Sequence, residues 1–216
     1  MIAYPHSYKG QALFRTFFQR GSVTEVAAPP LSDTDDDSVL IGRAREGNAA
    51  AFGILYERHR MSVYRYIAYR TQRQDVAEDL TSEVFLNAWK AIKRYQERGV
   101  SFRSWLLRLA HNEVVDFYRT RRSETSLPED GSLMPALDGP EGALVLQLDQ
   151  ATLLRAIHRL NEEWQHLILL RFVEGLSFEE IGVVLGKQSN ACRQMQHRAL
   201  ARLRLVLAEE EERGDG

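Results

Sequence analysis

Apolar residues recur along the chain at the spacing of α-helices and not at the alternation typical of strands. Three stretches in the first part of the chain carry an apolar or aromatic residue every three or four positions, which places those residues on one helix face. The stripes are Phe52, Tyr56, His59, Val63 and Ile67; Leu80, Val84, Ala88 and Ile92; and Leu106, Ala110, Val114 and Phe117. This pattern predicts a first helical domain over residues 37–122.

Polar residues and glycine predict where these helices begin and end. Asp75 with Glu78 has the spacing of a capping box, with Asp in the capping role, at the start of the second helix. Gly99 ends that helix, and Ser101 or Ser104 can cap the third. Residues 1–36 carry Gly, Pro and Ser and end in a cluster of Asp, which predicts a flexible N-terminal arm.

A break in this periodicity separates two helical blocks. Residues 123–146 are rich in Pro, Gly and acidic residues and show no apolar period, which predicts a linker. Apolar spacing then resumes at Leu153, Leu154, Ile157 and Leu160. Asn161 can cap a further helix that ends at Gly175 and is expected to bury Trp164, Leu167, Ile168 and Phe172.

The two blocks together define the expected fold. We expect an all-α protein of two small helical domains, residues 37–122 and 147–208, joined by a flexible acidic linker. An acidic tail follows over residues 209–216, where four consecutive Glu precede Arg213.

The end of the second block has the layout of a helix-turn-helix unit. Ser177 and Glu180 form the pattern of a capping box at the start of a short helix, and Gly186 ends that helix. After a brief turn, Ser189 can cap a longer helix. In a helix-turn-helix unit the second helix enters the major groove of DNA.

This second helix has one apolar face and one basic face. Residues 187–208 hold five Lys/Arg and no Asp or Glu, although the whole chain has a formal charge of −2. The apolar face comprises Cys192, Met195, Ala199, Leu203 and Val206. On the other face, Arg193 and Gln194 suit the base edges of guanine and adenine, while Arg198 and Arg202 suit phosphates. The alternative interpretation is a solvated basic face on a packed helix.

Composition restricts the function classes. The 216 residues include a single cysteine, which excludes a disulfide framework and fits a reducing cytoplasm. No apolar run reaches the roughly 18–20 residues of a membrane span, and the first residues lack the apolar core of a signal peptide. Gly-rich phosphate loops, Ser/His/Asp sets, paired-carboxylate sites and metal-ligand spacings are absent from the sequence. We therefore expect a cytoplasmic protein that is not an enzyme, with no catalytic residue, metal or cofactor.

Four segments in this order resemble the sigma-70 family of bacterial transcription initiation factors, in its two-domain extracytoplasmic-function (ECF) group. AREGNAAAFGILYERHRMSVYRY is similar to region 2.1 of the family, and DVAEDLTSEVFLNAWKAIKRY to region 2.2. SFRSWLLRLAHNEVVDFYRTRR is similar to regions 2.3 and 2.4, and LNEEWQHLILLRFVEGLSFEEIGVVLGKQSNACRQMQHRALARLR to region 4. The resemblance implies an alternative sigma factor that binds core RNA polymerase and directs promoter recognition and opening.

The resemblance implies roles for residues of the first domain. It implies a polymerase-binding surface at Asp79, Leu80, Ser82 and Glu83, where most relatives carry Gln in place of Ser82. For melting of the −10 element, it implies DNA contacts by Arg98, Ser101, Phe102, Arg103, Asn112 and Arg119. Nine Lys/Arg against three acidic residues between Lys90 and Arg122, with aromatic residues interleaved, fit a single-strand site.

In the second domain, the resemblance implies recognition of the −35 element. The contacts fall on Ser189, Arg193, Gln194, His197, Arg198 and Arg202. Met195 and Gln196 depart from the family pattern, in which a basic residue and a leucine are common. Gln196 projects toward the apolar side, so its amide needs a partner.

The implied partners are core RNA polymerase, promoter DNA and an anti-sigma factor. The contacts on the polymerase are the clamp helices of the largest subunit and the flap of the second-largest subunit. One alternative is a stand-alone helix-turn-helix regulator that binds operators as a dimer and needs no docking surface at Asp79 and Leu80. Another is an adaptor that binds polymerase without touching DNA, which leaves the basic helix unexplained.

Overall fold

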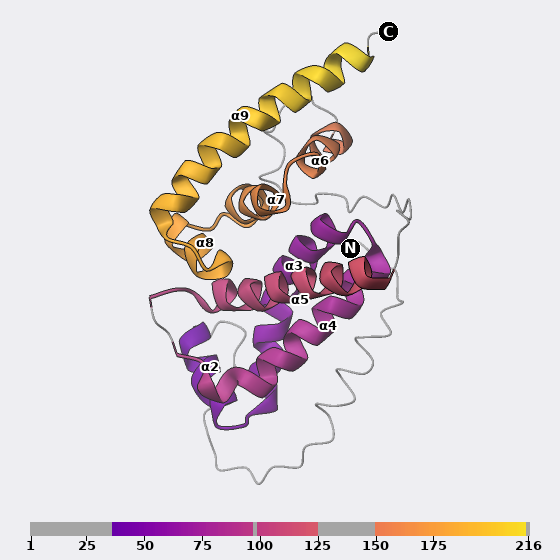
Figure 1. Cartoon of the computed structure of the whole chain (residues 1–216). Helices are drawn as coiled ribbons and strands as arrows, with labels where there is room; N and C mark the ends of the chain where they lie inside the picture. The colour runs from indigo at the N-terminus through magenta and orange to yellow at the C-terminus, as the bar shows by residue number, and fades with distance from the viewer. Residues whose placement is uncertain (1–35, 97–98, 125–149, 215–216) are drawn as a thin grey trace, which may run out of the picture.

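The computed structural model describes residues 36–96, 99–124 and 150–214. Within these ranges every regular element is helical (Figure 1), in the order α2 (Asp37–Arg45), α3 (Ala49–Thr71), α4 (Gln74–Ala91), η1 (Ile92–Arg94), α5 (Phe102–Glu124), α6 (Gln150–His158), α7 (Glu162–Ile168), η3 (Leu169–Val173), α8 (Phe178–Leu185) and α9 (Ser189–Gly214). The all-α prediction is confirmed. The predicted arm up to residue 35, Arg98 and nearly all of the predicted linker lie outside the described residues.

Helices α2 to α5 form the first domain around an apolar core. The predicted stripes face this core, with Phe52, Val84 and Leu106 fully buried. Helix α2 was not predicted from the apolar spacing. It is held by the Asp37 carboxylate, which forms an ion pair with Arg58 of α3 at 2.8 Å and a hydrogen bond with Nε2 of His59 on the same helix at 2.7 Å.

Helices α6 to α9 form the second domain, and its predicted turns are confirmed. The capping box of α8 has both of its bonds: the Glu180 amide donates to Ser177 Oγ at 3.2 Å, and the Ser177 amide donates to Glu180 Oε2 at 3.0 Å. Gly186 ends α8 in the left-handed region at φ 65°, which favours glycine. Asn161 caps α7 by accepting from the Trp164 amide at 2.9 Å.

Two predicted helix starts are wrong by one or two residues. Helix α4 already begins at Gln74, and Arg73 takes the capping position with no side-chain cap. Asp75 therefore lies inside the first turn, where its carboxylate pairs with Arg73 at 2.6 Å, so the capping box predicted for it does not form. In α9 the predicted cap Ser189 is itself helical, and the backbone carbonyl of Gln188 accepts the first helical hydrogen bond.

Phe172 was predicted to be buried and is 58% exposed. The helix that begins as α7 continues as the π-helical segment η3. A π-helical turn contains more residues than an α-helical turn, so the residues that follow rotate away from the face that an α-helical period predicts. Leu169 and Leu170 remain buried and Phe172 faces outward.

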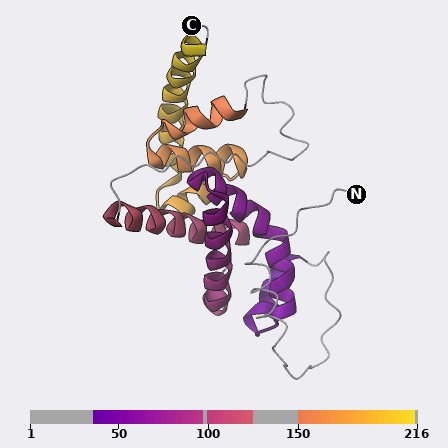
Figure 2. The ribbon, with the colours of Figure 1, turned by 90° about the vertical axis from the view of Figure 1, so that its right-hand side faces the viewer.

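The two domains, which the sequence predicted to be joined by a flexible linker, also pack against each other. Helices α6 to α9 lie on one side of α5 and helix α4 on the other (Figures 1 and 2). The contact joins α3 and α5 of the first domain to η3 and α8 of the second. We call this the closed arrangement.

The acidic residues after 208 continue helix α9, which runs to Gly214. Glu209 accepts a hydrogen bond from Arg159 at 2.5 Å, and its other oxygen lies 3.8 Å from a guanidinium nitrogen of Arg202. The first residue of the predicted tail is therefore packed on the second domain.

Candidate nucleic-acid and polymerase interfaces

Helix α9 has the two faces that the sequence predicted. The apolar set is buried, with Cys192, Ala199 and Val206 fully inaccessible. The opposite face is solvent-exposed and carries Arg193, Gln194, His197, Arg198 and Arg202. Ser189 is partly exposed at the first turn. The structure thus brings the predicted −35 residues together on one surface.

Arg193 is held from two directions by helix α8. One of its terminal nitrogens donates to Glu179 Oε1 at 3.0 Å. Its guanidinium also lies over the ring of Phe178, 5.2 Å from the ring centre, and Arg171 lies over the same ring at 4.8 Å. Ion pairing and ring contact reduce the number of rotamers open to a long side chain, so the guanidinium of Arg193 is held in a defined orientation.

The two departures in α9 have a structural consequence. Met195 is 9% exposed and packs into the domain core, so it adds no charge to the exposed face of α9. The side-chain oxygen of Gln196 is buried, and no described residue hydrogen-bonds to it. The sequence indicated that the Gln196 amide needs a hydrogen-bond partner, and its side-chain oxygen has none among the described residues.

The predicted polymerase-binding residues share one stretch of helix α4. Asp79 and Glu83 are exposed and lie one helical turn apart, while Leu80 packs partly against the core. The hydroxyl of Ser82 donates to the carbonyl oxygen of Glu78 at 3.0 Å, within its own helix. The surface is therefore an acidic ridge with a partly buried leucine beside it.

The predicted −10 residues that the structure describes lie along α5, and Arg98 lies outside the described residues. Asn112 and Arg119 are exposed, and Arg119 pairs with Asp116 at 3.0 Å. Ser101 and Arg103 lie at the beginning of the helix.

Phe102 does not fit its predicted role as a DNA contact. Its side chain is 3% exposed, and its ring packs against Tyr95 and Trp105, each with ring centres 5.3 Å apart, and against His59. An aromatic ring enclosed on these sides has no face left for a base. The burial of Phe102 could not be predicted from the sequence, because an aromatic residue at the start of a helix can face either DNA or the protein core.

Acidic residues of the second domain contact Ser101 and Arg103, which both remain at least partly exposed. Glu180 Oε1 accepts from the hydroxyls of Ser101 and Ser104, each at 2.7 Å. Glu174 lies 3.4 Å from a terminal nitrogen of Arg103 and is also bound by Ser62 and Arg65 of α3. From the sequence, Glu180 is predicted only as a helix cap. No local pattern indicates Ser62, Arg65 or Glu174, because Glu174 lies more than a hundred positions from the other two.

The Glu180 carboxylate is stabilised in its ionised form. Burial by itself raises the pKa of Glu180, but the hydrogen bonds from Ser101, from the Ser177 amide and from Ser104 outweigh it and lower the pKa to about 2. The same carboxylate therefore completes the capping box of α8 and binds the start of α5.

A cluster of neutral histidines lies at the same domain contact. The Tyr66 hydroxyl lies 2.6 Å from His166 Nδ1 and 3.2 Å from His111 Nδ1. Burial, together with the nearby charge of Arg70, lowers the pKa of His166 to about 2 and that of His111 to about 4. Both rings are therefore uncharged at neutral pH.

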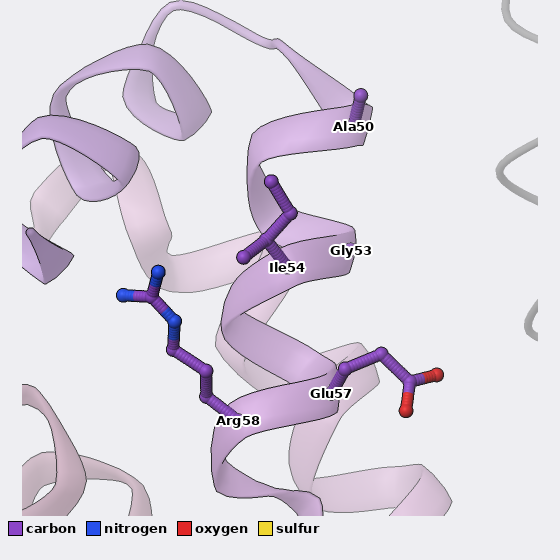
Figure 3. A pocket seen from close by; sticks show the side chains of 5 residues that line it. All are labelled: Ala50, Gly53, Ile54, Glu57 and Arg58. Carbon is purple, nitrogen blue, oxygen red and sulfur yellow. The ribbon is translucent and has the colours of Figure 1, made fainter. Parts of the chain in front are cut away.

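Features of other functional classes are few in the described part of the chain. It contains no group of three or more His, Cys, Asp or Glu side chains that could hold a metal ion. None of its helices combines the length and apolar character that crossing a bilayer requires. A shallow pocket of about 440 Å³ lies on α3, lined by Ala50, Gly53, Ile54, Glu57 and Arg58, and in Figure 3 the Glu57 carboxylate points away from Arg58. It contains none of the predicted site residues.

Comparison with known proteins identifies the family. The family described as sigma-70 region 2 matches residues 55–124, and the family described as sigma-70 region 4 matches residues 156–205. The chain belongs to the sigma-70 family. The two matches together cover more than half of the chain and correspond to the first and second domains.

Curated relatives are ECF sigma factors. The ECF RNA polymerase sigma factor BldN of Streptomyces coelicolor is 37% identical over 186 residues, which cover 84% of this chain and 70% of BldN. ShbA of Streptomyces griseus, another ECF RNA polymerase sigma factor, is 34% identical over 190 residues, which cover 82% of this chain and 99% of ShbA. The protein is an ECF-type sigma factor and not a stand-alone regulator, since both regions are present in order.

Solved structures share the fold. A structure of CnrH in complex with the cytosolic domain of CnrY matches with a TM-score of 0.63 and 26% identity, covering 81% of this chain and 99% of CnrH. The sigma factor RpoE of Bartonella quintana, solved with the anti-sigma factor NepR, matches with a TM-score of 0.61 and 22% identity, covering 73% of this chain and 96% of RpoE. The second of these bears on the fold alone.

Proposed function

We propose that this sigma factor directs promoter opening through three surfaces: α9 for the −35 element, the start and middle of α5 for the −10 element, and the acidic ridge of α4 for polymerase. The observation that carries the proposal is the exposed face of α9. Arg193 and Gln194 occupy its N-terminal turns, and further arginines follow along the same face. Arg and Gln pair with guanine and adenine through two hydrogen bonds each, and the later arginines suit phosphates.

The α4 ridge is the proposed contact with the clamp helices of the largest polymerase subunit. Asp79 and Glu83 are exposed and available to basic groups of a partner. The second domain would contact the flap of the second-largest subunit while α9 lies on DNA. Such a protein acts in the cytoplasm, where polymerase and promoters are, and serves as an initiation factor and not as a catalyst.

An anti-sigma factor is the further partner that we propose. The structures that share the fold include complexes of a sigma factor with a second protein, one of which is described as an anti-sigma factor. The acidic ridge of α4 and the α5 surface are the places where such a partner would block polymerase and DNA.

Run-off transcription with core polymerase and a library of genomic fragments tests the proposal. The expected result is that the chain causes core polymerase to start at a small set of fragments that share −35 and −10 sequences. Transcription that begins without the added chain, or that begins on fragments with no common −35 and −10 sequences, would contradict the proposed function.

A further inference from the structure

The carboxylate of Glu174 is completely enclosed against the first domain, although it belongs to the second. Its side chain has no exposed area. Arg65 Nε donates to Glu174 Oε1 at 2.9 Å, and Arg65 Nη2 donates to Oε2 at 3.2 Å. The Ser62 hydroxyl donates to Oε2 as well, and Arg103 lies 3.4 Å from the same oxygen. Three side chains of the first domain therefore surround one carboxylate.

These three side chains carry more positive charge than the carboxylate neutralises. Two guanidinium groups face one carboxylate, and each arginine side chain is still more than a third exposed, at 38% for Arg65 and 36% for Arg103. The Nε of Arg103 is buried and has no hydrogen-bond partner among the described residues. The hydrogen bonds to Glu174 raise the pKa of Arg65, although burial opposes the change. On the first domain, these side chains form a cationic cluster around the position of the carboxylate, which we call the pocket, and Arg103 Nε is a further donor without a described partner.

We propose that Ser62, Arg65 and Arg103 form a phosphate-binding site for the backbone of the −10 single strand, and that Glu174 occupies this site in the closed arrangement. Neither Ser62 nor Arg65 was among the DNA-binding residues implied by the family resemblance. The inference rests on the proposed function, because it assigns a new contact to the same −10 surface.

The chemistry of the pocket fits a phosphodiester. A phosphodiester presents one negative charge on two non-bridging oxygens, as a carboxylate does. The guanidinium fork of arginine binds either group through two parallel hydrogen bonds. Single-strand sites need a positive track for the backbone beside the residues that read bases. The pocket lies beside Ser101, because Arg103 belongs to both the pocket and the start of α5.

Glu174 and DNA would compete for the pocket. Glu180 accepts hydrogen bonds from the hydroxyls of Ser101 and Ser104 beside this pocket, so two carboxylates of one domain contact the proposed −10 surface of the other. A phosphate can replace Glu174 against Ser62, Arg65 and Arg103 only when the second domain has moved away, although both arginine side chains remain partly exposed in the closed arrangement. The acidic pair therefore makes the closed arrangement a competitor of DNA, and removing one carboxylate should favour the strand.

The test is the affinity of the full-length chain for a fluorescent single-stranded oligonucleotide that carries the non-template −10 sequence found by run-off transcription. Glu174→Gln keeps the size of the side chain and removes its charge, and we expect it to tighten binding by about tenfold. The matched control is Glu163→Gln, which removes an exposed carboxylate of the same domain whose described partner is Lys187 at 3.1 Å. This control should change affinity by less than about twofold.

The pocket itself is tested in the Glu174→Gln background. Adding Arg65→Gln should remove the gain in affinity for the oligonucleotide. Adding Ser62→Ala should remove part of that gain with little effect on folding, since this substitution deletes only one hydroxyl. If Glu174→Gln does not fold, holoenzyme with Ser62→Ala or Arg65→Gln should form fewer open complexes than wild-type holoenzyme at equal polymerase binding.

Two outcomes would overturn the inference. One is equal affinity of the Glu174→Gln and Glu163→Gln chains for the oligonucleotide. The other is an unchanged affinity or open-complex yield when Arg65 or Ser62 is replaced. If wild-type holoenzyme initiates normally in either case, the proposed function stands and only the phosphate site is wrong. Failure of wild-type holoenzyme to initiate at any promoter would instead contradict the proposed function.

Discussion

The Arg193 side chain, which we propose reads a base, is held in place by its own fold. Glu179 and Phe178 hold the guanidinium at the N-terminal end of α9, on the exposed face. Arg202 lies further along the helix, and its contact is a longer one to Glu209, at 3.8 Å. We propose that Arg193 reads a base edge and that Arg202 contacts the phosphate backbone, which is the same for every sequence.

We expect Arg193→Ala and Arg202→Ala to weaken promoter binding by holoenzyme in different ways. Loss of a two-bond contact to guanine should cost about 1–3 kcal/mol on the preferred −35 sequence and little on a sequence already mutated at that base. Loss of a phosphate contact should weaken binding on all sequences. It should also reduce, by about one, the steepness with which the logarithm of affinity falls with the logarithm of salt concentration. Titrations on matched and mismatched promoters at several salt concentrations measure both effects. Equal losses on every sequence for both variants would show that Arg193 does not read a base.

At the scale of the element, the turn between α8 and α9 depends on a glycine. A Cβ added at Gly182 would lie 2.6 Å from the backbone carbonyl oxygen of Lys187, closer than such atoms approach in proteins. The carbonyl belongs to the turn, so it cannot move without displacing α9 from α8. The absence of a side chain at Gly182 therefore sets how closely the two helices of the unit approach.

We expect Gly182→Ala to lower the stability of the second domain by about 1–3 kcal/mol through this overlap. The control is Gly53→Ala on α3, where an added Cβ meets nothing within 4 Å and the helix should gain up to about 1 kcal/mol. Thermal unfolding followed by circular dichroism measures both. A Gly182→Ala chain as stable as wild type would mean that the turn can relax around the methyl group.

Features that depend on the α-helical spacing of nearby residues were predictable from the sequence. Features that depend on contacts between distant residues were not. The two faces of α9 and the capping box of α8 depend only on residues a few positions apart, so their spacing was sufficient. Phe172 faces outward because a π-helical turn replaces the α-helical period, and a stripe of apolar residues cannot show that change. Of the predicted site, the position of α9 was foreseeable, whereas the burial of Phe102 and the Glu174 contacts depend on how separate helices meet.

At the scale of the whole molecule, the closed arrangement buries histidines that must stay neutral. The His166 side chain is 4% exposed and faces Tyr66, His111 and Arg70. Burial lowers the pKa of His166 to about 2 and that of His111 to about 4, from the usual 6.5. A group with a lowered pKa contributes stability above its ordinary pKa and loses it as the pH falls toward the lowered value.

We therefore expect the domains to separate as the pH falls below about 6.5. At about pH 5 each of the two rings should weaken the contact by about 2 kcal/mol, because a ring that is free to protonate favours the separated form. Small-angle X-ray scattering should show a larger radius of gyration at about pH 5 than at about pH 7.5. The increase in the radius of gyration at low pH should be smaller in the His166→Gln chain. It should be unchanged in the His197→Gln chain, because the His197 ring is exposed on α9. A radius that does not change with pH would contradict the role of the buried histidines.

The central claim is that promoter recognition is shared between two domains that core polymerase holds apart. Each domain alone offers a small contact area, and in the closed arrangement Glu174 and Glu180 contact residues of the proposed −10 surface. Core polymerase would hold both domains at promoter spacing and raise the effective concentration of the second by about 10²–10⁴.

A mobility-shift titration of promoter DNA at physiological salt, with and without core polymerase, tests this claim most directly. The chain alone should scarcely shift the DNA, and the same amount with core polymerase should shift it fully. Asp79→Arg reverses an exposed charge on α4 and should abolish the polymerase-dependent shift while leaving thermal stability close to that of wild type. Tight binding by the chain alone, unaffected by core polymerase and by Asp79→Arg, would contradict the account.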